Sequence, residues 1–157
     1  MNKKIIAIIL TLLAFTGGIL LLWQNFRKAP DIEQFSLSEE YYGEGVFEEI
    51  DAARFAELVE NKKSFVVVPR MMFCPAGMPM TTNAETIAAR DNIKIFSILD
   101  IEFKQTELAK TVKYLPSAAI YRDGKLVAWL DAESDDDMQF YESPDGFELW
   151  LKTYLSF

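Results

Sequence analysis

Residues 114–127 read YLPSAAIYRDGKLV, and this stretch decides the fold. Pro116 cannot continue a helix, so the chain turns there into an apolar strand over Ala118–Tyr121. The turn that follows, Arg122–Lys125, contains Asp-Gly, a pair that tolerates positive φ and is typical of tight hairpins. Leu126–Leu130 is then the returning strand. The stretch therefore predicts an antiparallel hairpin that begins just after a proline.

A second apolar strand lies upstream and leads to the only cysteine of the chain. Phe65–Val68 is wholly apolar and rich in β-branched residues, a pattern typical of strands buried on both faces of a sheet. Cys74 follows in the segment FCPAG, residues 73–77. The thiol is therefore expected in a loop beyond the end of a central strand.

From Val46 onward the remaining patterns alternate between strand and helix. Asp51, Asn83, and Ser143 or Asp145 are side chains that suit helix N-caps. The predicted elements are strands over 46–50 and 93–98, and helices from Asp51 to about residue 61, from Asn83 to Arg90, over 105–114, and after Ser143 or Asp145. This order predicts an α/β fold whose partly parallel sheet is covered by helices and has an antiparallel edge.

The predicted order of elements resembles that of the thioredoxin fold. The resemblance rests on the strand that ends near Cys74, on Tyr114-Leu115-Pro116, and on the hairpin over residues 118–127. It covers roughly residues 46–157. It implies a thioredoxin-like domain with a central mixed sheet flanked by helices, here preceded by one N-terminal transmembrane helix.

The resemblance also implies a site. Cys74 matches the nucleophile of the family's Cys-x-x-Cys motif, and Gly77 stands where the second, resolving cysteine would be. Pro116 matches the family's proline, which is expected to be cis, to face the thiol, and to leave the backbone of Leu115 free to hold an extended peptide. Pro75 suits the first position of a helix that starts right after Cys74. Cys74 is thus the candidate catalytic residue, and Pro75, Leu115 and Pro116 are candidate substrate-binding residues.

Several readings of the thiol remain open. A single cysteine cannot resolve its own mixed disulfide, which leaves a monothiol exchanger that needs an external thiol, a redox-sensing site, or a domain that only binds a partner. A buried, inert cysteine is the plainer alternative. Arg70 is a candidate cationic neighbour that would lower the thiol pKa, and without histidine no Cys–His pair can form.

No cofactor or metal is expected. Met71, Met72, Met78 and Met80 surround the cysteine, and loop packing or a soft rim for a partner explains them better than a copper site does. The acidic run over residues 131–137 lacks the turn glycine and the spaced terminal glutamate of a calcium loop, so a solvated acidic loop is favoured.

The N-terminal segment predicts a membrane anchor. Ile5–Trp23 carries no charge, and as a helix it nearly spans a hydrocarbon layer about 30 Å thick. A cleaved signal peptide would have a shorter apolar run, although Thr16-Gly17-Gly18 supplies small residues within it. We expect an anchor over residues 1–28, a linker over 29–44 and the thioredoxin-like domain over 45–157. Lys3 and Lys4 slightly favour a cytoplasmic N-terminus and a domain outside.

The acidic charge of the chain limits the kinds of partner that we expect. All 24 acidic residues follow residue 28, whereas four of the 16 basic residues do not, and such an acidic domain is not expected to bind nucleic acid. The expected protein is a single-pass membrane protein with an extracytoplasmic domain. The domain acts by monothiol disulfide exchange on exported cysteine-containing proteins, or by thiol-guided binding of them. The alternative is a non-enzymatic interaction module that has lost redox activity.

Overall fold

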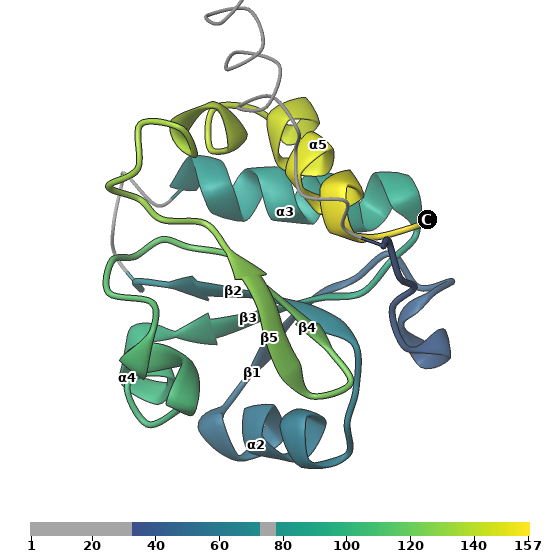
Figure 1. The fold of residues 1–157 in the computed structure, drawn as a ribbon, viewed down its shortest axis with the longest axis vertical. Helices are drawn as coiled ribbons and strands as arrows, with labels where there is room; N and C mark the ends of the chain where they lie inside the picture. The colour runs from purple at the N-terminus through teal and green to yellow at the C-terminus, as the bar shows by residue number, and fades with distance from the viewer. Residues whose placement is uncertain (1–32, 73–77) are drawn as a thin grey trace, which may run out of the picture. The chain divides into compact units, whose positions relative to one another are not determined.

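A mixed β-sheet forms the centre of the domain (Figure 1). The computed structural model describes residues 33–72 and 78–157, and within them five strands pair in the order β1-β3-β2-β4-β5. β1 and β2 run parallel to β3, whereas β4 is antiparallel to both β2 and β5. The strands are β1 (Phe47–Ile50), β2 (Phe65–Arg70), β3 (Ile95–Leu99), β4 (Ala119–Arg122) and β5 (Lys125–Trp129).

Helices cover both faces of this sheet. In Figure 1, α3 and α5 lie on one side of the strands, and α2 and α4 lie on the other. The α-helices are α2 (Ala52–Glu60), α3 (Met78–Asp91), α4 (Asp100–Phe103) and α5 (Pro144–Tyr154). Short 3-10 helices occur at η1 (Glu39–Tyr41), η3 (Glu107–Lys110) and η4 (Met138–Phe140). The architecture confirms the predicted α/β class with its helix-covered mixed sheet.

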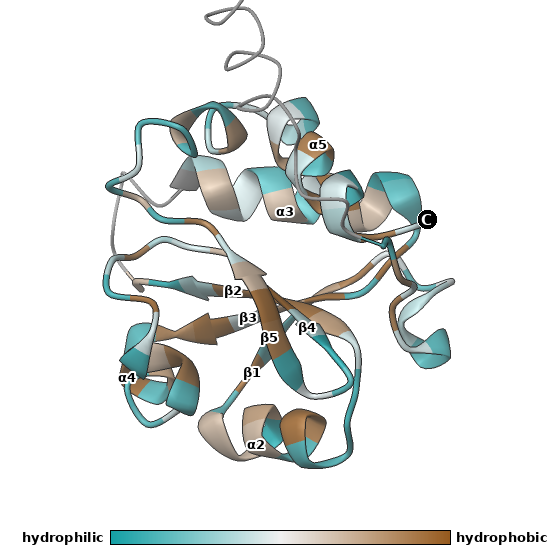
Figure 2. Cartoon of the chain, in the orientation of Figure 1, coloured by the Kyte–Doolittle hydropathy of each residue, from teal (hydrophilic) through white to brown (hydrophobic). Residues whose placement is uncertain are grey.

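The middle of the sheet explains why β2 is so apolar. Phe65, Val66, Val67 and Val68 are all fully enclosed, because helices pack on both faces of this central strand. Figure 2 shows that hydrophobic residues concentrate in the strands and the sheet-facing parts of the helices. At roughly 1.5–3 kcal/mol for each fully buried large apolar side chain, burial of this kind is the main force that holds the sheet together.

Three local signals give the structure that the sequence predicts. Asp51 caps α2, since its Oδ1 accepts a hydrogen bond of 2.7 Å from the Arg54 N–H. Ser143 caps α5 in the same way, with its hydroxyl accepting from the Gly146 N–H at 3.1 Å. In the β4–β5 turn, Asp123 and Gly124 have φ of 52° and 74°, as a tight hairpin with two positive-φ residues requires.

Two helix predictions are wrong. α3 begins at Met78 and not at Asn83, because Pro79 lies in the first helical turn, where its missing N–H costs no hydrogen bond. Asn83 is buried inside the helix, where its side chain donates to the Tyr141 carbonyl at 2.8 Å. In place of the helix predicted over 105–114, the chain forms only the single turn η3, which follows α4 after residues 104–106.

The N-terminal boundary also differs from the predicted linker over residues 29–44. Residues 34–157 form one compact unit. Phe35, Leu37 and Tyr41 are buried in its core, and Phe35 forms a parallel bridge with Leu155. Apolar and polar residues alternate in this segment, but its overall acidity led to the prediction of a linker.

The predicted anchor over Ile5–Trp23 lies outside the described residues. So do two of the candidate site residues, Cys74 and Pro75. In residues 33–72 and 78–157, no helix has the length and apolar character to cross a membrane.

Candidate functional site

The loop around Pro116 is fastened to the end of the strand that leads toward Cys74. The Leu115–Pro116 peptide bond is cis, as the sequence resemblance implies. The next residue, Ser117, donates its N–H to the Pro69 carbonyl at 3.2 Å. Pro69 is the penultimate residue of β2, so this bond joins the proline loop to the C-terminal end of the central strand. The chain reaches Cys74 four residues after β2 ends.

Ser117 is also held from the other side. It is fully buried, and its hydroxyl donates to the Leu130 carbonyl at 2.6 Å, while the Leu130 N–H donates to the Ala118 carbonyl at 2.9 Å. These bonds fix the chain just after the cis proline between β2 and the end of β5. Within the described part of the chain, the backbone of Leu115 makes no hydrogen bond, and both Leu115 and Pro116 are half-buried.

Large apolar side chains are exposed on the two sides of this loop. Met71 and Met72, which follow β2, are 40% and 55% exposed. Tyr114 is 48% exposed just before Leu115, and Trp129 is 42% exposed at the end of β5. We call these four residues the apolar rim. Tyr114 and Trp129 also line a small cavity of about 100 Å³. Tyr114 and Trp129 therefore lie together, and neighbouring exposed apolar groups are typical of a binding surface.

Acidic groups border the apolar rim. Hydrogen bonding to the Glu133 carboxylate raises the pKa of Tyr114, because the neutral phenol can donate to the carboxylate and the phenolate cannot. Within residues 131–137, Asp137 accepts from the Asp131 N–H at 2.8 Å, and Asp131 accepts from the Glu133 N–H at 3.0 Å. The acidic run is therefore partly organised by bonds to its own backbone.

Arg70, the candidate cationic neighbour of the thiol, is already paired. Its guanidinium forms an ion pair with Glu49 of β1, two strands away across the sheet. Its Nε is enclosed and has no hydrogen-bond partner within the described residues. Because this ion pair offsets part of its charge, Arg70 is a weaker cationic neighbour than the sequence suggested.

A layer of buried polar groups lies behind the proline loop. Asn83 of α3 holds the Tyr141 backbone, which follows η4. Burial raises the pKa of Tyr141, and the nearby carboxylates Asp137 and Asp131 add to that effect. Sequence analysis missed Ser117 and Tyr141 as supporting residues. The local signal for Ser117 was a polar residue directly before an apolar strand, and Tyr141 had no such signal.

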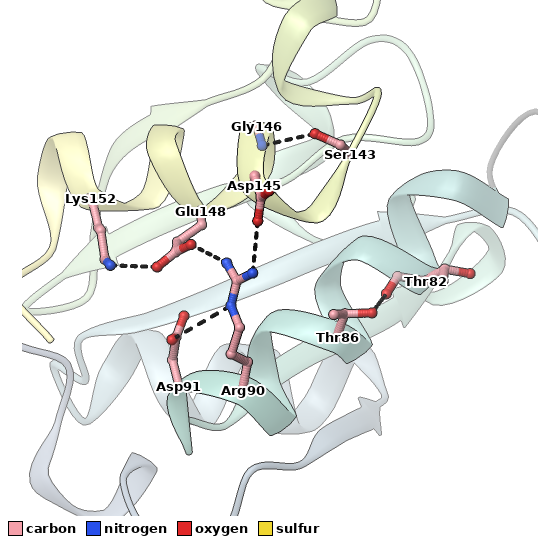
Figure 3. A network of polar contacts seen from close by, with 9 residues as sticks. All are labelled: Thr82, Thr86, Arg90, Asp91, Ser143, Asp145, Gly146, Glu148 and Lys152. Carbon is pink, nitrogen blue, oxygen red and sulfur yellow. Dashed lines mark hydrogen bonds and ion pairs between the residues drawn. The ribbon is translucent and has the colours of Figure 1, made fainter.

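The far end of α3 is tied to α5 by a charged network (Figure 3). The Arg90 guanidinium bonds Asp145 at 2.8 Å and also bonds Glu148, which in turn binds Lys152. Asp91 lies 3.9 Å from the Arg90 Nε. The network thus fixes the helix that directly follows the cysteine segment.

The described residues contain no metal centre. No three histidine, cysteine, aspartate or glutamate side chains in residues 33–72 and 78–157 come together in a way that could hold a metal ion. Met80, one of the four methionines near the cysteine, is buried and so belongs to the core.

Comparison with known proteins identifies the fold. No protein-family model matches the sequence, and no curated protein matches it either. Among solved structures, the long form of thioredoxin F from spinach chloroplast matches with a TM-score of 0.53 at 18% identity, covering 69% of this chain and 86% of that one. The domain has the thioredoxin fold.

Two other thioredoxins match over similar lengths. A thioredoxin from Malassezia sympodialis has a TM-score of 0.53 at 12% identity, covering 71% of this chain and 93% of its own. A mutant thioredoxin from Halobacterium salinarum has a TM-score of 0.51 at 14% identity, covering 74% and 96%. At these low sequence identities, the similarity supports a shared fold alone. In this thioredoxin fold, the cis-proline loop and the end of β2 lie together.

Proposed function

We propose that this protein is a membrane-anchored thioredoxin-fold protein that uses Cys74 in monothiol disulfide exchange with exported cysteine-containing proteins, or in thiol-guided binding of them. The observation that carries the proposal is the position of the Pro116 loop, which the hydrogen bond from the Ser117 N–H to the Pro69 carbonyl joins to the end of β2. The same strand leads to Cys74 along the chain. A thiol and a peptide-holding loop are the two parts that such a site needs.

The exchange step uses one thiol of this chain. The Cys74 thiolate attacks a sulfur of the partner's disulfide, the partner's S–S bond breaks, and a new S–S bond joins Cys74 to the partner. The other partner sulfur leaves as a thiolate and takes up a proton. Because Gly77 supplies no second thiol, an external thiol must then attack the mixed disulfide and restore Cys74.

We expect the N-terminus of α3 to favour an ionised thiol. Its first residue, Met78, follows Cys74 by four positions, and the partial positive charge of a helix N-terminus lowers the pKa of a nearby thiol. The pairing of Arg70 with Glu49 leaves this helix as the stronger candidate source of activation. We expect rapid alkylation of Cys74 with an apparent pKa below about 8.5.

The apolar rim would receive the partner. An extended peptide lying along the backbone of Leu115, which has no hydrogen-bond partner within residues 33–72 and 78–157, would form main-chain hydrogen bonds there, while its side chains contact Met72, Tyr114 and Trp129. Flexible methionine side chains adapt to different partners. Pro75 would border the peptide on the thiol side.

Localisation is part of the proposal. The uncharged run Ile5–Trp23 would anchor the protein by a single transmembrane helix, with the domain outside the cytoplasm. A reporter fused after Phe157 should be active only outside the cytoplasm; activity only inside would contradict this placement.

Trapping of mixed disulfides tests the thiol chemistry. Membranes that contain the full chain are quenched with acid, alkylated and separated without reductant, and adducts are identified by mass spectrometry. We expect adducts with the wild type and none with Cys74→Ser. Gly77→Cys supplies a resolving thiol and should reduce the adduct yield severalfold, whereas the Cys74→Ser, Gly77→Cys double variant reports any adducts of the new thiol alone. Equal yields from wild type and Cys74→Ser would refute the proposal.

The interaction module is the second candidate, and the exposed apolar rim favours it. A module that needs no thiol would bind its partner equally well in the wild type and in Cys74→Ser. Trp129→Ala would weaken capture in both backgrounds. Capture that is lost in Cys74→Ser would rule the module out.

A further inference from the structure

A large cavity lies away from the thiol site. It has a volume of about 610 Å³ and opens between α2 and the segment over residues 105–111. Ala52, Ala56 and Val59 of α2 line one wall, Leu108 lines the other, and Tyr121 of β4 lies between them. No residue of the apolar rim and neither Leu115 nor Pro116 takes part. Its volume is within the range usual for small-molecule sites.

Local structure explains why the cavity exists. The segment opposite α2 contains only the 3-10 turn Glu107–Lys110, where the sequence predicts a full helix over 105–114. On the facing side, α2 presents the small side chains of Ala52 and Ala56 toward the gap. The short 3-10 turn on one side and the small alanine side chains of α2 on the other together leave space next to β4 and β5.

Tyr121 supplies a polar group within this apolar site. The residue is only 5% exposed, and its ring stacks on Phe65 at 4.7 Å and meets Phe55 edge-on at 5.6 Å. The aromatic contacts fix the ring in one orientation. Within the described residues, its hydroxyl forms no hydrogen bond, and burial raises the pKa of this phenol. Tyr121 lines the cavity, and a neutral O–H that has no partner in the described residues is a donor that a ligand acceptor there would satisfy.

The charges around the cavity select against anions. Glu60, Glu107 and Lys110 are its charged lining residues, and the Lys110 ammonium already bonds both carboxylate oxygens of Glu107, at 2.9 and 2.7 Å. The Glu60 carboxylate is the remaining charge of the lining, and it forms no ion pair with the residues that the structure describes. An anionic ligand would be repelled there, whereas an uncharged ligand would be unaffected.

We propose that this cavity is a binding site for an uncharged, largely apolar small molecule that carries one hydrogen-bond acceptor. The ligand's apolar body would occupy the space between α2 and residues 105–111. Its acceptor would take the hydrogen bond of the Tyr121 hydroxyl. The site is separate from the proposed thiol chemistry, so either one can fail without the other.

Benzophenone is a suitable probe, because it is uncharged and aromatic, carries one carbonyl acceptor, and crosslinks to nearby C–H bonds when irradiated. The full-length protein in detergent micelles is labelled across a concentration series, and the modified peptides are mapped by mass spectrometry. We expect saturable labelling of α2 and of residues 105–111. Labelling spread evenly over the chain, or without saturation at these peptides, would overturn the proposal.

Variants distinguish labelling in the cavity from nonspecific labelling of hydrophobic surface. Ala56→Trp fills the cavity and should abolish the saturable labelling, whereas Ala89→Trp, at an exposed position on α3, should leave it unchanged. Ala52→Leu is the smaller filling variant to use if Ala56→Trp does not fold. Tyr121→Phe removes only the hydroxyl, so it should keep the melting temperature and weaken half-saturation roughly two- to tenfold. Unchanged labelling in both a folded filling variant and Tyr121→Phe would refute the site.

Discussion

The charge of Asp91 fits its surroundings poorly. Its side chain is 17% exposed, and one carboxylate oxygen, Oδ2, is enclosed without a partner in the described part of the chain. Burial raises the pKa of Asp91, and the nearby Glu148 carboxylate raises it further, against the weaker opposing effect of Arg90. The folded state therefore favours the protonated form of Asp91 more than the unfolded state does. This preference stabilises the fold fully at pH values below the pKa that Asp91 has in the unfolded chain. The stabilisation is lost as the pH rises through the pKa of Asp91 in the folded state.

We expect Asp91→Asn to stabilise the protein at pH 7 by up to about 1 kcal/mol, because the neutral amide avoids the cost of a partly buried charge. The gain should shrink as pH falls toward the ordinary aspartate value of 3.8, where Asp91 is itself protonated. Thermal unfolding of both proteins between pH 3.5 and about 8 measures the difference.

Asp145→Asn is the matched control for that experiment. Asp145 belongs to the same network, is 86% exposed, and bonds Arg90 at 2.8 Å. The same chemical change there should give no stabilisation, since it removes a favourable pair and relieves no burial. A gain in Asp91→Asn that is independent of pH would contradict the assigned cause.

At the scale of elements, the β4–β5 turn depends on a close contact with α2. The Gly124 N–H donates to the Lys63 carbonyl at 2.9 Å, and the Asp123 N–H donates to the Ser64 hydroxyl at 3.0 Å. A Cβ added at Gly124 would lie 2.3 Å from the Val59 backbone oxygen, in addition to the strain of its φ of 74°. The turn therefore requires glycine for both its conformation and its packing.

Gly124→Ala should destabilise the protein by about 2–5 kcal/mol, because backbone strain and overpacking act together. Gly43→Ala is the matched control: φ there is 94°, but an added Cβ meets nothing within 4 Å. We expect a loss of only about 1–2 kcal/mol for Gly43→Ala. Urea unfolding gives both values. Equal losses would show that the contact with Val59 contributes nothing.

The same scale shows which parts of the fold the sequence could predict. The hairpin, the Asp51 and Ser143 caps and the strand β2 were predictable, because each depends on the chemistry of a few adjacent residues. The start of α3 was not, since Asn83 looks like a cap but is drawn inside the helix by its bond to Tyr141, 58 residues away. The full helix expected over 105–114 does not form, because its helical pattern is weak. Packing of Leu108 and Val112 in the core outweighs that pattern.

The candidate site was predictable to a similar extent. Pro116 stands out in the sequence because it separates a helix-like segment from a strand, and the structure bears out its cis bond. The bonds that position it, from Ser117 to Pro69 and to Leu130, join residues 48 and 13 positions apart and leave no local pattern. Cys74 and Pro75 remain predictions from the sequence.

At the scale of the whole molecule, the two ends of the domain hold each other. Phe35 donates its N–H to the Tyr154 carbonyl and accepts from the Ser156 N–H, both at 3.0 Å. Its ring is 8% exposed and lies 5.1 Å from the Arg122 guanidinium. Residues near position 35 therefore close the fold against the end of α5, and any anchor that precedes them would be attached to a firmly packed segment.

We expect Phe35→Ala to lower the free energy of unfolding by about 3 kcal/mol, because it removes a large buried ring from the core. Ser36→Ala, at the adjacent exposed residue, should change it by less than about 0.5 kcal/mol. Denaturant unfolding of the full chain, followed by the fluorescence of Trp150 near this end of the domain, measures both. If residues 29–44 acted only as a linker, the two variants would be equally stable. A loss confined to Phe35→Ala would instead establish that the folding unit includes this segment.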